Sequence, residues 1–355
     1  MRIVLTGGGT GGHICPLAAV ASQLRLNEQD KNIELLWLGE AGGREELAAK
    51  RLNIKFTGLL CGKVRRYFSI RNLFDLIKLP LGFMQAFLIL AKFKPRVVFS
   101  KGGYVSWPVS LAASLMGIKV VLHESDMVMG LTNKILARFA SKVLLGWPIK
   151  ENLDIKGEIK VVGNPIRSEV LTADRATALN FFKLAGKSPV VLVLGGSQGA
   201  SEINKFISAN LGELLSVCRI IHLTGKNKKE IESRDGYYVA EELSASDLAL
   251  AYVLADLIIS RAGANTLAEI AAWAKPTVLL PLASSANNHQ LANAEYFASQ
   301  QAAVICEPGI ADNLKLLVVN LLRDQNKLLL LAKNVKKLAY PNANQNIAGE
   351  ILKYA

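Results

Sequence analysis

The sequence predicts two α/β domains in tandem, each built on a parallel β-sheet with helices on both faces. Short apolar runs alternate with helix-like stretches along the chain, a pattern typical of such sheets. A glycine-rich turn follows an apolar run at 7–13 and again at 195–199, so the second half repeats the start of the first. The length of 355 residues also exceeds what one typical core contains.

The first half is expected to form five strands with helices between them. The first helix should have Pro16 in its first turn. His13, the turn 102–106 and residues 124–126 each follow an expected strand, so they should lie together at the ligand-binding edge of the sheet. The expected strands are 2–6, 33–38, 95–100, 119–123 and 143–146, and the expected helices are 16–24, 109–116 and 131–140.

The second half is expected to begin after a linker. Chain-breaking residues at 163–165 and the polar stretch after them predict a linker near 163–187. The predicted domains are therefore 1–163 and 164–340, followed by a C-terminal helix over 341–355. The expected strands are 189–194, 219–223, 257–260 and 277–280, and the expected helices are 200–215, 247–254, 264–273 and a helical tail from about 312.

Composition narrows the class of protein. The chain is 51% hydrophobic and 20% charged, as in a globular and rather apolar protein. It enters its first strand at once, so we expect no signal peptide. Scattered cysteines without paired spacing indicate a reducing compartment and argue against a disulfide framework or a zinc site. These cysteines are Cys15, Cys61, Cys218 and Cys306.

The formal net charge of +13 is concentrated in residues 61–101, where nine basic side chains and one acidic one give +8. Bulky apolar residues are mixed with these charges, a composition typical of a segment that lies on an anionic membrane surface. An amphipathic core helix with a solvated basic face is the alternative. A transmembrane helix is not expected because Asp75, Lys78 and Pro80 interrupt the apolar run. No nucleic-acid-binding module accompanies the charge, so nucleic acid is not an expected partner.

The turn 7–13 has the composition of an anion-binding loop. Strand, glycine turn and helix together aim backbone N–H groups at a phosphate, and His13 places a titratable group beside it. The glycine spacing also fits a dinucleotide site, with Glu40 as the ribose-binding acid, which would make the chain a nicotinamide enzyme. The extra glycine, the histidine and the second glycine turn at 195–199 argue against that interpretation.

A second anion-binding turn is expected at 261–269. Gly263 and Ala264 allow close backbone approach at a helix N-terminus, and Glu269 lies within reach of the two hydroxyls of a ribose. The alternative is a helix-capping loop with a surface glutamate. The amide of Gln290 suits sugar hydroxyls because it both donates and accepts hydrogen bonds.

A series of motifs follows along the chain: Gly8–His13, Gly102–Ser106, His123-Glu124, Gly130–Lys134, Val162–Arg167, Gly195–Ala200 and Ser260–Gly263 with Glu269. Taken together and in this order, they closely resemble the MurG family, bacterial glycosyltransferases that complete the lipid-linked disaccharide of peptidoglycan. The resemblance covers most of the chain. It implies a GT-B fold, in which two Rossmann-like doubly wound domains face each other across the active-site cleft.

The resemblance implies inverting, metal-independent transfer of N-acetylglucosamine from UDP-N-acetylglucosamine to the C4 hydroxyl of the muramoyl sugar on undecaprenyl diphosphate. It implies no cofactor, a peripheral location on the cytoplasmic face of the bacterial inner membrane, and other cell-wall synthesis proteins as further partners. The implied donor-binding residues are Thr10, Gly11, Gly12, Asp126, Arg167, Ser197, Ala245, Gly263, Ala264, Asn265, Thr266, Leu267, Ala268, Glu269 and Gln290. The implied acceptor-binding residues are Gly9, Gly102, Gly103, Tyr104 and Ser106.

Direct inversion needs a base on the acceptor hydroxyl and stabilisation of the leaving diphosphate. A helix N-terminus, backbone N–H groups and Arg167 can stabilise the diphosphate without a metal, and the sequence has no Asp-x-Asp pair. His13 is the first candidate for the base and Glu124 the second, although His13 as a positioning donor is an open alternative.

Three positions depart from the family pattern. The family usually has Asn at Asp126 and a small or apolar residue at Lys101, and its acidic residues are missing from 283–288. Two rival functions remain open at this point: a soluble UDP-sugar enzyme such as an epimerase, and a membrane-bound nucleotide sensor without catalytic activity.

Overall fold

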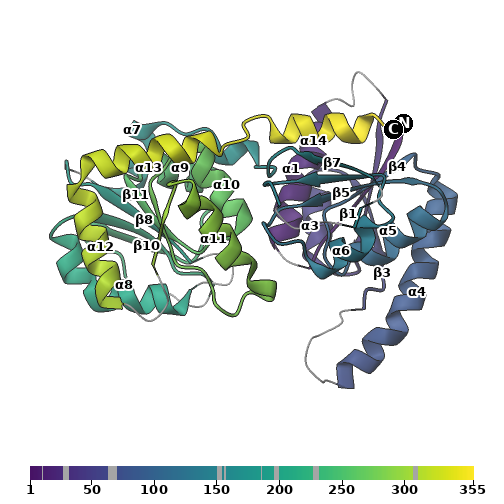
Figure 1. Cartoon of the computed structure of the whole chain (residues 1–355), viewed down its shortest axis with the longest axis horizontal. Coiled ribbons are helices and arrows are strands. Elements are labelled where there is room, and N and C mark those ends of the chain that lie inside the picture. The colour runs from purple at the N-terminus through teal and green to yellow at the C-terminus, as the bar shows by residue number, and fades with distance from the viewer. Residues whose placement is uncertain are drawn as a thin grey trace. The chain divides into compact units, whose positions relative to one another are not determined.

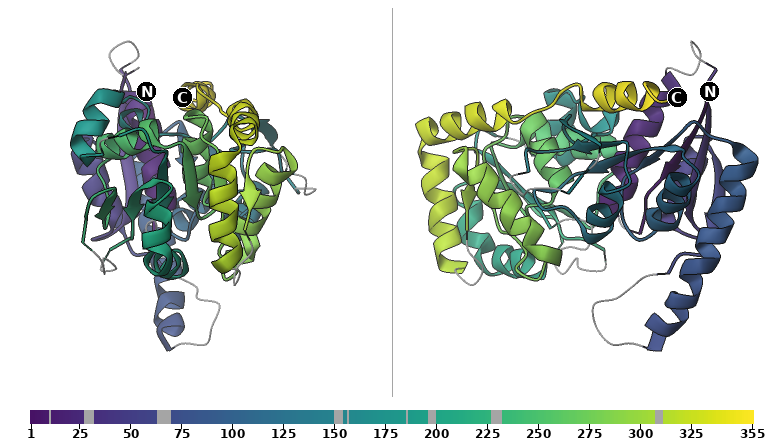
Figure 2. Two further views of the ribbon diagram at one scale, coloured as in Figure 1. Left: turned by 90° about the vertical axis from the view of Figure 1, so that its left-hand side faces the viewer. Right: turned by 45° about the vertical axis from the view of Figure 1, so that its right-hand side comes forward.

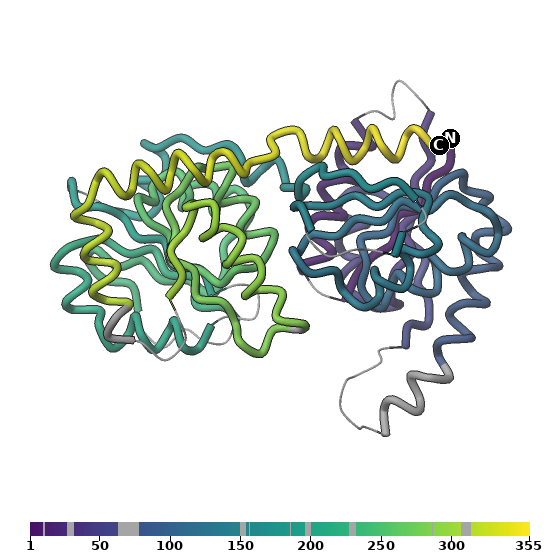
Figure 3. Tube along the Cα trace, in the orientation of Figure 1, coloured from purple at the N-terminus to yellow at the C-terminus, as the bar shows by residue number. Residues whose placement is uncertain are grey.

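The computed structural model describes residues 1–9, 11–26, 32–62, 70–149, 154–155, 157–184, 186–195, 200–226, 232–306 and 311–355 (Figure 1). The chain forms two compact units. Unit 1 comprises Met1–Ile166 and Asn342–Ala355, and unit 2 comprises Arg167–Pro341. The chain thus passes from one unit to the other twice, a path that the trace in Figure 3 follows.

The sheet of unit 1 is entirely parallel and has the strand order β3-β2-β1-β4-β5-β6-β7. The strands are β1 Arg2–Thr6, β2 Glu34–Glu40, β3 Lys55–Leu59, β4 Val97–Ser100, β5 Lys119–Glu124, β6 Lys142–Leu145 and β7 Glu158–Val161. The helices are α1 Gly11–Leu26, α3 Arg44–Arg51, α4 Ile70–Phe93, α5 Ser106–Leu115, α6 Leu131–Ala137 and α14 Ala343–Leu352.

The strands of this sheet are apolar on both sides because helices cover both faces. Val4 and Val98 belong to a cluster that includes side chains of α4, α5 and α6. Ile3 and Leu5 belong to the opposite cluster, which includes side chains of α1 and α14. The C-terminal helix therefore completes the core of the unit in which the chain begins, and the two termini lie near each other in every view (Figure 2).

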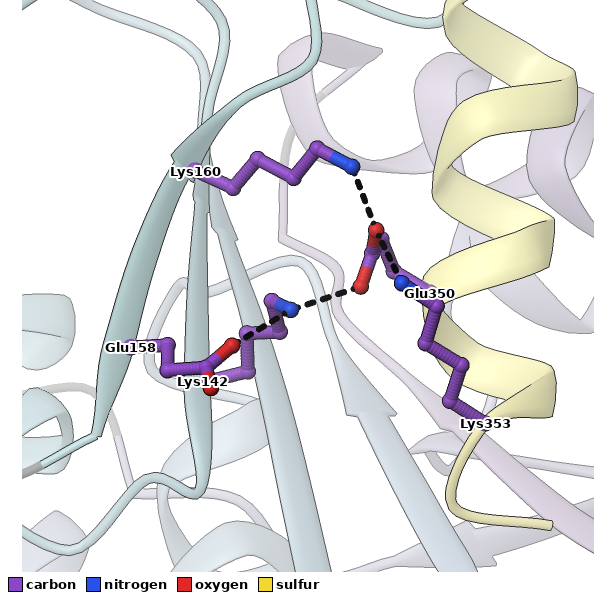
Figure 4. A network of polar contacts seen from close by, with 5 residues as sticks. All are labelled: Lys142, Glu158, Lys160, Glu350 and Lys353. Atoms are coloured by element: carbon purple, nitrogen blue, oxygen red, sulfur yellow. Dashed lines mark hydrogen bonds and ion pairs between the residues drawn. The ribbon is translucent and has the colours of Figure 1, made fainter.

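A buried carboxylate attaches α14 to the sheet (Figure 4). Glu350 on α14 is 3% exposed, and its carboxylate lies 2.7 Å from Lys142 Nζ, 2.6 Å from Lys160 Nζ and 2.9 Å from Lys353 Nζ. Lys142 also pairs with Glu158 at 2.8 Å. Burial alone would favour the neutral acid, but the three ammonium groups outweigh it and lower the pKa of Glu350 to about 2.

The sheet of unit 2 is also entirely parallel, in the order β10-β9-β8-β11-β12-β13. The strands are β8 Val190–Leu194, β9 Arg219–Leu223, β10 Tyr237–Ala240, β11 Leu257–Ser260, β12 Thr277–Leu279 and β13 Val304–Ile305. The α-helices are α7 Arg175–Phe182, α8 Ser201–Leu215, α9 Ala245–Leu254, α10 Ala264–Ala272, α11 His289–Ser299, α12 Ala311–Arg323 and α13 Gln325–Lys337, and the short 3-10 helices are η1 Ser168–Val170 and η2 Ala286–Asn288.

The prediction of two α/β domains with parallel sheets is confirmed, but two local predictions were wrong. Residues 163–187 are not a linker, because η1 and α7 lie within them and pack against α9, and Asp174 caps α7 by accepting from Thr177 N–H at 2.8 Å. The first helix begins at Gly11, which puts His13 in its first turn and Pro16 in its second. The units divide between Ile166 and Arg167, three residues after the predicted boundary, and 342–355 belongs to unit 1.

Two candidate ligand-binding edges

Each sheet reverses its strand order at one place, and ligands of such sheets bind outside the carboxyl ends of the strands at that place. In unit 1 the reversal lies between β1 and β4, where Thr6 pairs with Ser100. In unit 2 it lies between β8 and β11, where Leu194 pairs with Ser260. We call the loops 7–13, 101–106 and 124–133 of unit 1 the first edge. The second edge comprises 195, 261–269 and 282–290 of unit 2.

The two glycine loops of the first edge touch each other. Gly103 has a φ of +82°, and a Cβ atom there would lie 2.8 Å from the carbonyl oxygen of Gly8 and 3.5 Å from the ring of His13. A Cβ on Gly9, at a φ of +85°, would lie 2.5 Å from the ring of Tyr104. Glycine is therefore required at both positions, and His13 lies beside the loop that follows β4.

The N-terminus of α1 also belongs to the first edge. Gly11, Gly12 and His13 form its first turn. The N–H groups of a first helical turn point out along the axis, which suits an anion. His13 is half-buried and Gly12 is exposed. The predicted donor residue Thr10 lies outside the described residues.

Carboxylates of β2 and α3 hold these loops in place. Tyr104 Oη donates to Glu40 Oε2 at 2.6 Å, and the buried Glu45 accepts from the Gly9 N–H at 3.2 Å. Burial and the neighbouring Glu40 raise the pKa of Tyr104, so the phenol stays protonated and remains a donor. Glu40 therefore binds a protein hydroxyl instead of serving as the ribose acid of a dinucleotide site. Ser106 Oγ donates to the carbonyl oxygen of Gly103 at 2.9 Å and holds that loop closed.

Glu124 is buried, and both of its oxygens accept hydrogen bonds from the loop that follows β5. Oε1 accepts from the N–H groups of Ser125 at 2.8 Å and Asp126 at 3.1 Å. Oε2 accepts from Gly130 N–H and from Asn133 Nδ2, both at 3.0 Å. Burial and the charge of Asp126 raise the pKa of Glu124, while Lys101 and the N–H donors act in the opposite direction. The predicted second base thus organises residues 125–133, and Asp126 lies half-buried within that loop.

At the second edge, α10 begins directly after the turn that follows β11. Gly263 is its extended N-cap, and Ala264 through Ala268 form its first turns. Two buried polar side chains fix the turn. Arg261 donates to the carbonyl oxygen of Leu280 at 2.9 Å and pairs with Glu202 on α8 at 2.7 Å. Asn293 Nδ2 donates to the carbonyl oxygen of Ala262 at 2.9 Å.

Glu269 lies on α10 beside a tyrosine of α9. Tyr252 Oη donates to Glu269 Oε2 at 2.9 Å, and the Tyr252 ring stacks on Trp273. Burial raises the pKa of Glu269, while the Tyr252 hydroxyl and the charge of Arg167 both lower it. Arg167, Tyr252 and Glu269 thus act on one another, which places the predicted arginine and the predicted ribose acid in one neighbourhood.

The remaining described donor candidates of unit 2 lie on α9, α10 and α11. Gln290 lies at the start of α11, and its Oε1 accepts from the Leu282 N–H at 3.0 Å, which ties the loop 282–290 to the helix. Ala245 is the first residue of α9, next to its cap Ser244. Asn265 and Thr266 are half-buried on α10. Ser197 lies outside the described residues. Among the residues that the structure describes, no group of three or more His, Cys, Asp or Glu side chains could hold a metal ion.

Family models match most of the chain. The glycosyltransferase family 28 N-terminal domain matches residues 3–145, and the glycosyltransferase family 28 C-terminal domain matches residues 190–347. The chain belongs to glycosyltransferase family 28. Relatives that match nearly the whole chain confirm the predicted resemblance to the MurG glycosyltransferases.

Two of these relatives are named UDP-N-acetylglucosamine–N-acetylmuramyl-(pentapeptide) pyrophosphoryl-undecaprenol N-acetylglucosamine transferase. The protein of Legionella pneumophila strain Paris is 37% identical over 99% of this chain and 97% of its own length. That of Lachnoclostridium phytofermentans is 36% identical over 98% of this chain and 96% of its own.

Solved structures agree with the fold. The crystal structure of Acinetobacter baumannii MurG matches with a TM-score of 0.78 and 31% identity over 99% of both chains. A UDP-GlcNAc 2-epimerase of Neisseria meningitidis, bound to UDP-GlcNAc, matches with a TM-score of 0.72 over 99% of this chain and all of its own. At 16% identity the epimerase shows the fold alone.

Sequence reasoning missed several residues that shape both edges. Tyr252 is the one residue with a polar group in the apolar stretch 248–254 of α9, and this could have marked it as a candidate site residue. Arg261 and Asn133 stood within quoted motifs without an assigned role. Glu45 had no signal, because nothing in the sequence of α3 indicates that its carboxylate reaches Gly9.

Proposed function

We propose that the chain transfers N-acetylglucosamine from UDP-N-acetylglucosamine to the C4 hydroxyl of the muramoyl sugar on undecaprenyl diphosphate, with inversion and without a metal. This reaction converts lipid I to lipid II in peptidoglycan synthesis. Relatives that match nearly the full length bear the name of this activity. The observation that supports the donor site most directly is Glu269, which lies on α10 beside Tyr252 and under the charge of Arg167.

The donor then binds mainly at the second edge. The N-terminal turns of α10 and the guanidinium of Arg167 stabilise the diphosphate, including the negative charge that UDP gains as it leaves. Glu269 accepts from the ribose hydroxyls, and Tyr252 holds the carboxylate in place through Oε2. Ala245 and its loop border the uracil. Gln290, at the start of α11, completes the proposed donor contacts of unit 2. The other predicted donor residues Gly11, Gly12 and Asp126 belong to the first edge, and their contact with the donor stays a prediction.

The acceptor binds at the first edge. The glycine loops present the backbone N–H groups of Gly102 and Gly103 to the acceptor diphosphate, with Tyr104 and Ser106 supporting them. Gly9, whose N–H is bound by Glu45, lets the diphosphate approach the backbone closely. His13 is the base that takes the proton of the C4 hydroxyl, since it is half-buried beside Gly103 in the first turn of α1. Glu124 has a structural role, because its two carboxylate oxygens already accept four hydrogen bonds from the protein.

We further propose that unit 1 binds the cytoplasmic face of the bacterial inner membrane. Leu81, Met84 and Leu88 are exposed on α4 at helical spacing, with the exposed Lys78 and Lys92 on the same helix. Residues 63–69 of the predicted membrane segment lie outside the described residues. In the described part of the chain, no helix has the length and apolar character needed to span a bilayer. Leu131 and Ile135 on α6, which packs against α5, and Phe139 just after α6 are also exposed apolar side chains of this unit.

Transfer of radiolabel from UDP-N-acetylglucosamine to a muramoyl-diphosphate lipid tests the reaction. We expect transfer that depends on the lipid acceptor and persists with a chelator present. Consumption of the donor without the acceptor would support the epimerase alternative. Binding of the donor by folded protein with no transfer would contradict the proposal.

Co-sedimentation with anionic and neutral vesicles tests the membrane surface. We expect Leu88→Ser to weaken binding to anionic vesicles. Leu329→Ser, at an exposed position of α13, is the control and should leave this binding unchanged.

A further inference from the structure

Trp273 caps the C-terminus of α10 one helical turn after Glu269, and its side chain makes two separate contacts. Its indole N–H donates to the carbonyl oxygen of Val170 at 2.8 Å. Its ring stacks on that of Tyr252, with 6.4 Å between the ring centroids and 12° between the ring planes. One half-buried side chain therefore contacts both η1 and α9.

The contact with Val170 reaches Arg167 through the backbone of η1. Val170 is fully buried, and its N–H donates to the carbonyl oxygen of Arg167 at 3.1 Å. Arg167 is the N-cap of η1 and the first residue of unit 2, directly after the division between the units. A residue at such a division keeps its place in unit 2 only if its segment is attached to that unit. The hydrogen bond from Trp273 provides this attachment, together with the packing of η1 on α9.

The contact with Tyr252 reaches Glu269. Tyr252 is fully buried, and its hydroxyl donates to Glu269 Oε2 at 2.9 Å. Burial raises the pKa of Tyr252 and of Glu269, and the charge of Arg167 acts against this rise in both. The guanidinium is thus close enough to both groups for its charge to act on them. Trp273 therefore contacts the segment that carries the arginine and also the partner of the carboxylate.

We propose that Trp273 is a positioning residue that holds Arg167 and Glu269 in the arrangement that binds a nucleoside diphosphate. This inference rests on the proposed function and concerns residues of unit 2 alone. The indole N–H acts through η1 and fixes the arginine for the diphosphate. The indole ring acts through Tyr252 and fixes the carboxylate for the ribose hydroxyls. Because the ligand needs both groups at one separation, the residue that contacts both segments raises affinity without touching the ligand.

Two substitutions at Trp273 separate its two contacts. Trp273→Phe keeps an aromatic ring beside Tyr252 but has no N–H for Val170. We expect it to weaken binding of UDP about three- to tenfold and to leave binding of uridine, which has no diphosphate, unchanged. Trp273→Leu also removes the stacking ring and should weaken binding of both ligands. Calorimetry on the full chain gives the dissociation constants of UDP, and NMR titration gives those of uridine.

A double-mutant cycle with Arg167→Met tests the path through the arginine. Trp273→Phe should add nothing to the loss of UDP affinity in Arg167→Met, since the indole N–H acts only through the arginine. Trp107→Phe, at a half-buried position of α5 in unit 1, is the matched control and should bind both ligands as the unchanged chain does. If Trp273→Phe fails to fold, replacement of Trp273 by benzothienylalanine takes its place, because sulfur then replaces the N–H in a ring of the same shape.

Unchanged UDP affinity in Trp273→Phe would overturn the proposal, as would an equal loss for UDP and uridine. Losses that multiply in the variant with both Trp273→Phe and Arg167→Met would also overturn it, because Trp273 would then act independently of the arginine. Sugar transfer is measured separately. If the unchanged chain binds UDP but transfers no sugar, the proposed function fails, whereas the binding cycle still decides the role of Trp273. If it binds no UDP, both proposals fail.

Discussion

The two units share one topology but hold the loops at their reversal points in different ways. In unit 1, buried ionisable groups fix the loops: Glu45 binds Gly9, Lys101 binds Ser125 and Glu124 binds four donors. In unit 2, Arg261 fixes the turn after β11 through its ion pair with Glu202. Glu269, the acid that we propose to bind the ligand, accepts a hydrogen bond from the neutral hydroxyl of Tyr252. Charged groups that are already paired within the protein thus shape the first edge. At the second edge, Glu269 is the acid that we propose to bind the ligand.

This difference predicts a division of labour. An edge whose charges are compensated internally can hold a base in a fixed position beside the acceptor, which affects turnover. An edge whose acid keeps an oxygen for hydroxyl groups of a ligand affects donor affinity. Variants of the first edge should therefore change kcat, and variants of the second edge should change the KM for UDP-N-acetylglucosamine.

The largest effect is expected from His13→Ala. Loss of a general base typically lowers the rate about 10²- to 10⁴-fold. We expect kcat to fall within this range while the KM of the donor changes by less than about threefold. Steady-state kinetics measures both values, and Gln23→Ala on the same helix is the control. A kcat that stays within about twofold would place the base elsewhere and remove the proposed contrast between the edges.

The next largest effect is expected for Glu350 on α14, the C-terminal helix that packs in unit 1. The pKa of Glu350, lowered from 4.5 to about 2, corresponds to about 3 kcal/mol of stability. Because the folded pKa lies below the unfolded one, this contribution is present above pH 4.5 and is lost as the pH falls toward 2. We expect Glu350→Gln to lower the unfolding midpoint at pH 7 and to show a weaker loss of stability between pH 4.5 and 2. Thermal scans across this pH range, with exposed Glu46→Gln as the control, measure the effect. Equal acid sensitivity in both variants would contradict the role of Glu350.

The sequence predicted what local residue types reveal. Apolar strands, glycine turns and the Gly263–Glu269 helix start are local signals, so the fold class and the positions of most candidate residues followed from them. Weak strands were missed, as in β7, where Glu158 and Lys160 alternate with apolar residues at an exposed edge of the sheet. The first helix was predicted to begin too late because Pro16 was taken as its start.

The sequence predicted that the loops of the first edge meet, but it did not predict which side chains pair across them. Lys101 and Ser125 are 24 residues apart, and Arg261 and Glu202 are 59 apart. Neither pair has a spacing that marks it. The burial of Lys101 was also unexpected, since a lysine at the end of a strand ordinarily extends to solvent. Only the packing of β1, β4 and β5 brings this ammonium to Ser125.

Glu269→Ala should raise the KM of UDP-N-acetylglucosamine about 10- to 100-fold, because a charge-assisted hydrogen bond contributes about 1.5–3 kcal/mol. The value of kcat at saturating donor should change less, since the ribose lies away from the reacting carbon. Kinetics with the donor varied at fixed acceptor measures the split. Glu295→Ala, at an exposed position of α11, is the control. A fall in kcat at unchanged KM would assign Glu269 to catalysis and reverse the comparison.

Tyr252→Phe should give the smallest effect and the sharpest distinction. It removes only the hydroxyl that donates to Glu269 Oε2 and keeps the ring that stacks on Trp273. One such hydrogen bond contributes about 1 kcal/mol, so we expect the donor KM to rise about three- to tenfold. Because the hydroxyl acts through Glu269, Tyr252→Phe should add nothing to Glu269→Ala. A further loss in the double variant would mean that Tyr252 contacts the donor directly, instead of acting through Glu269 as we propose.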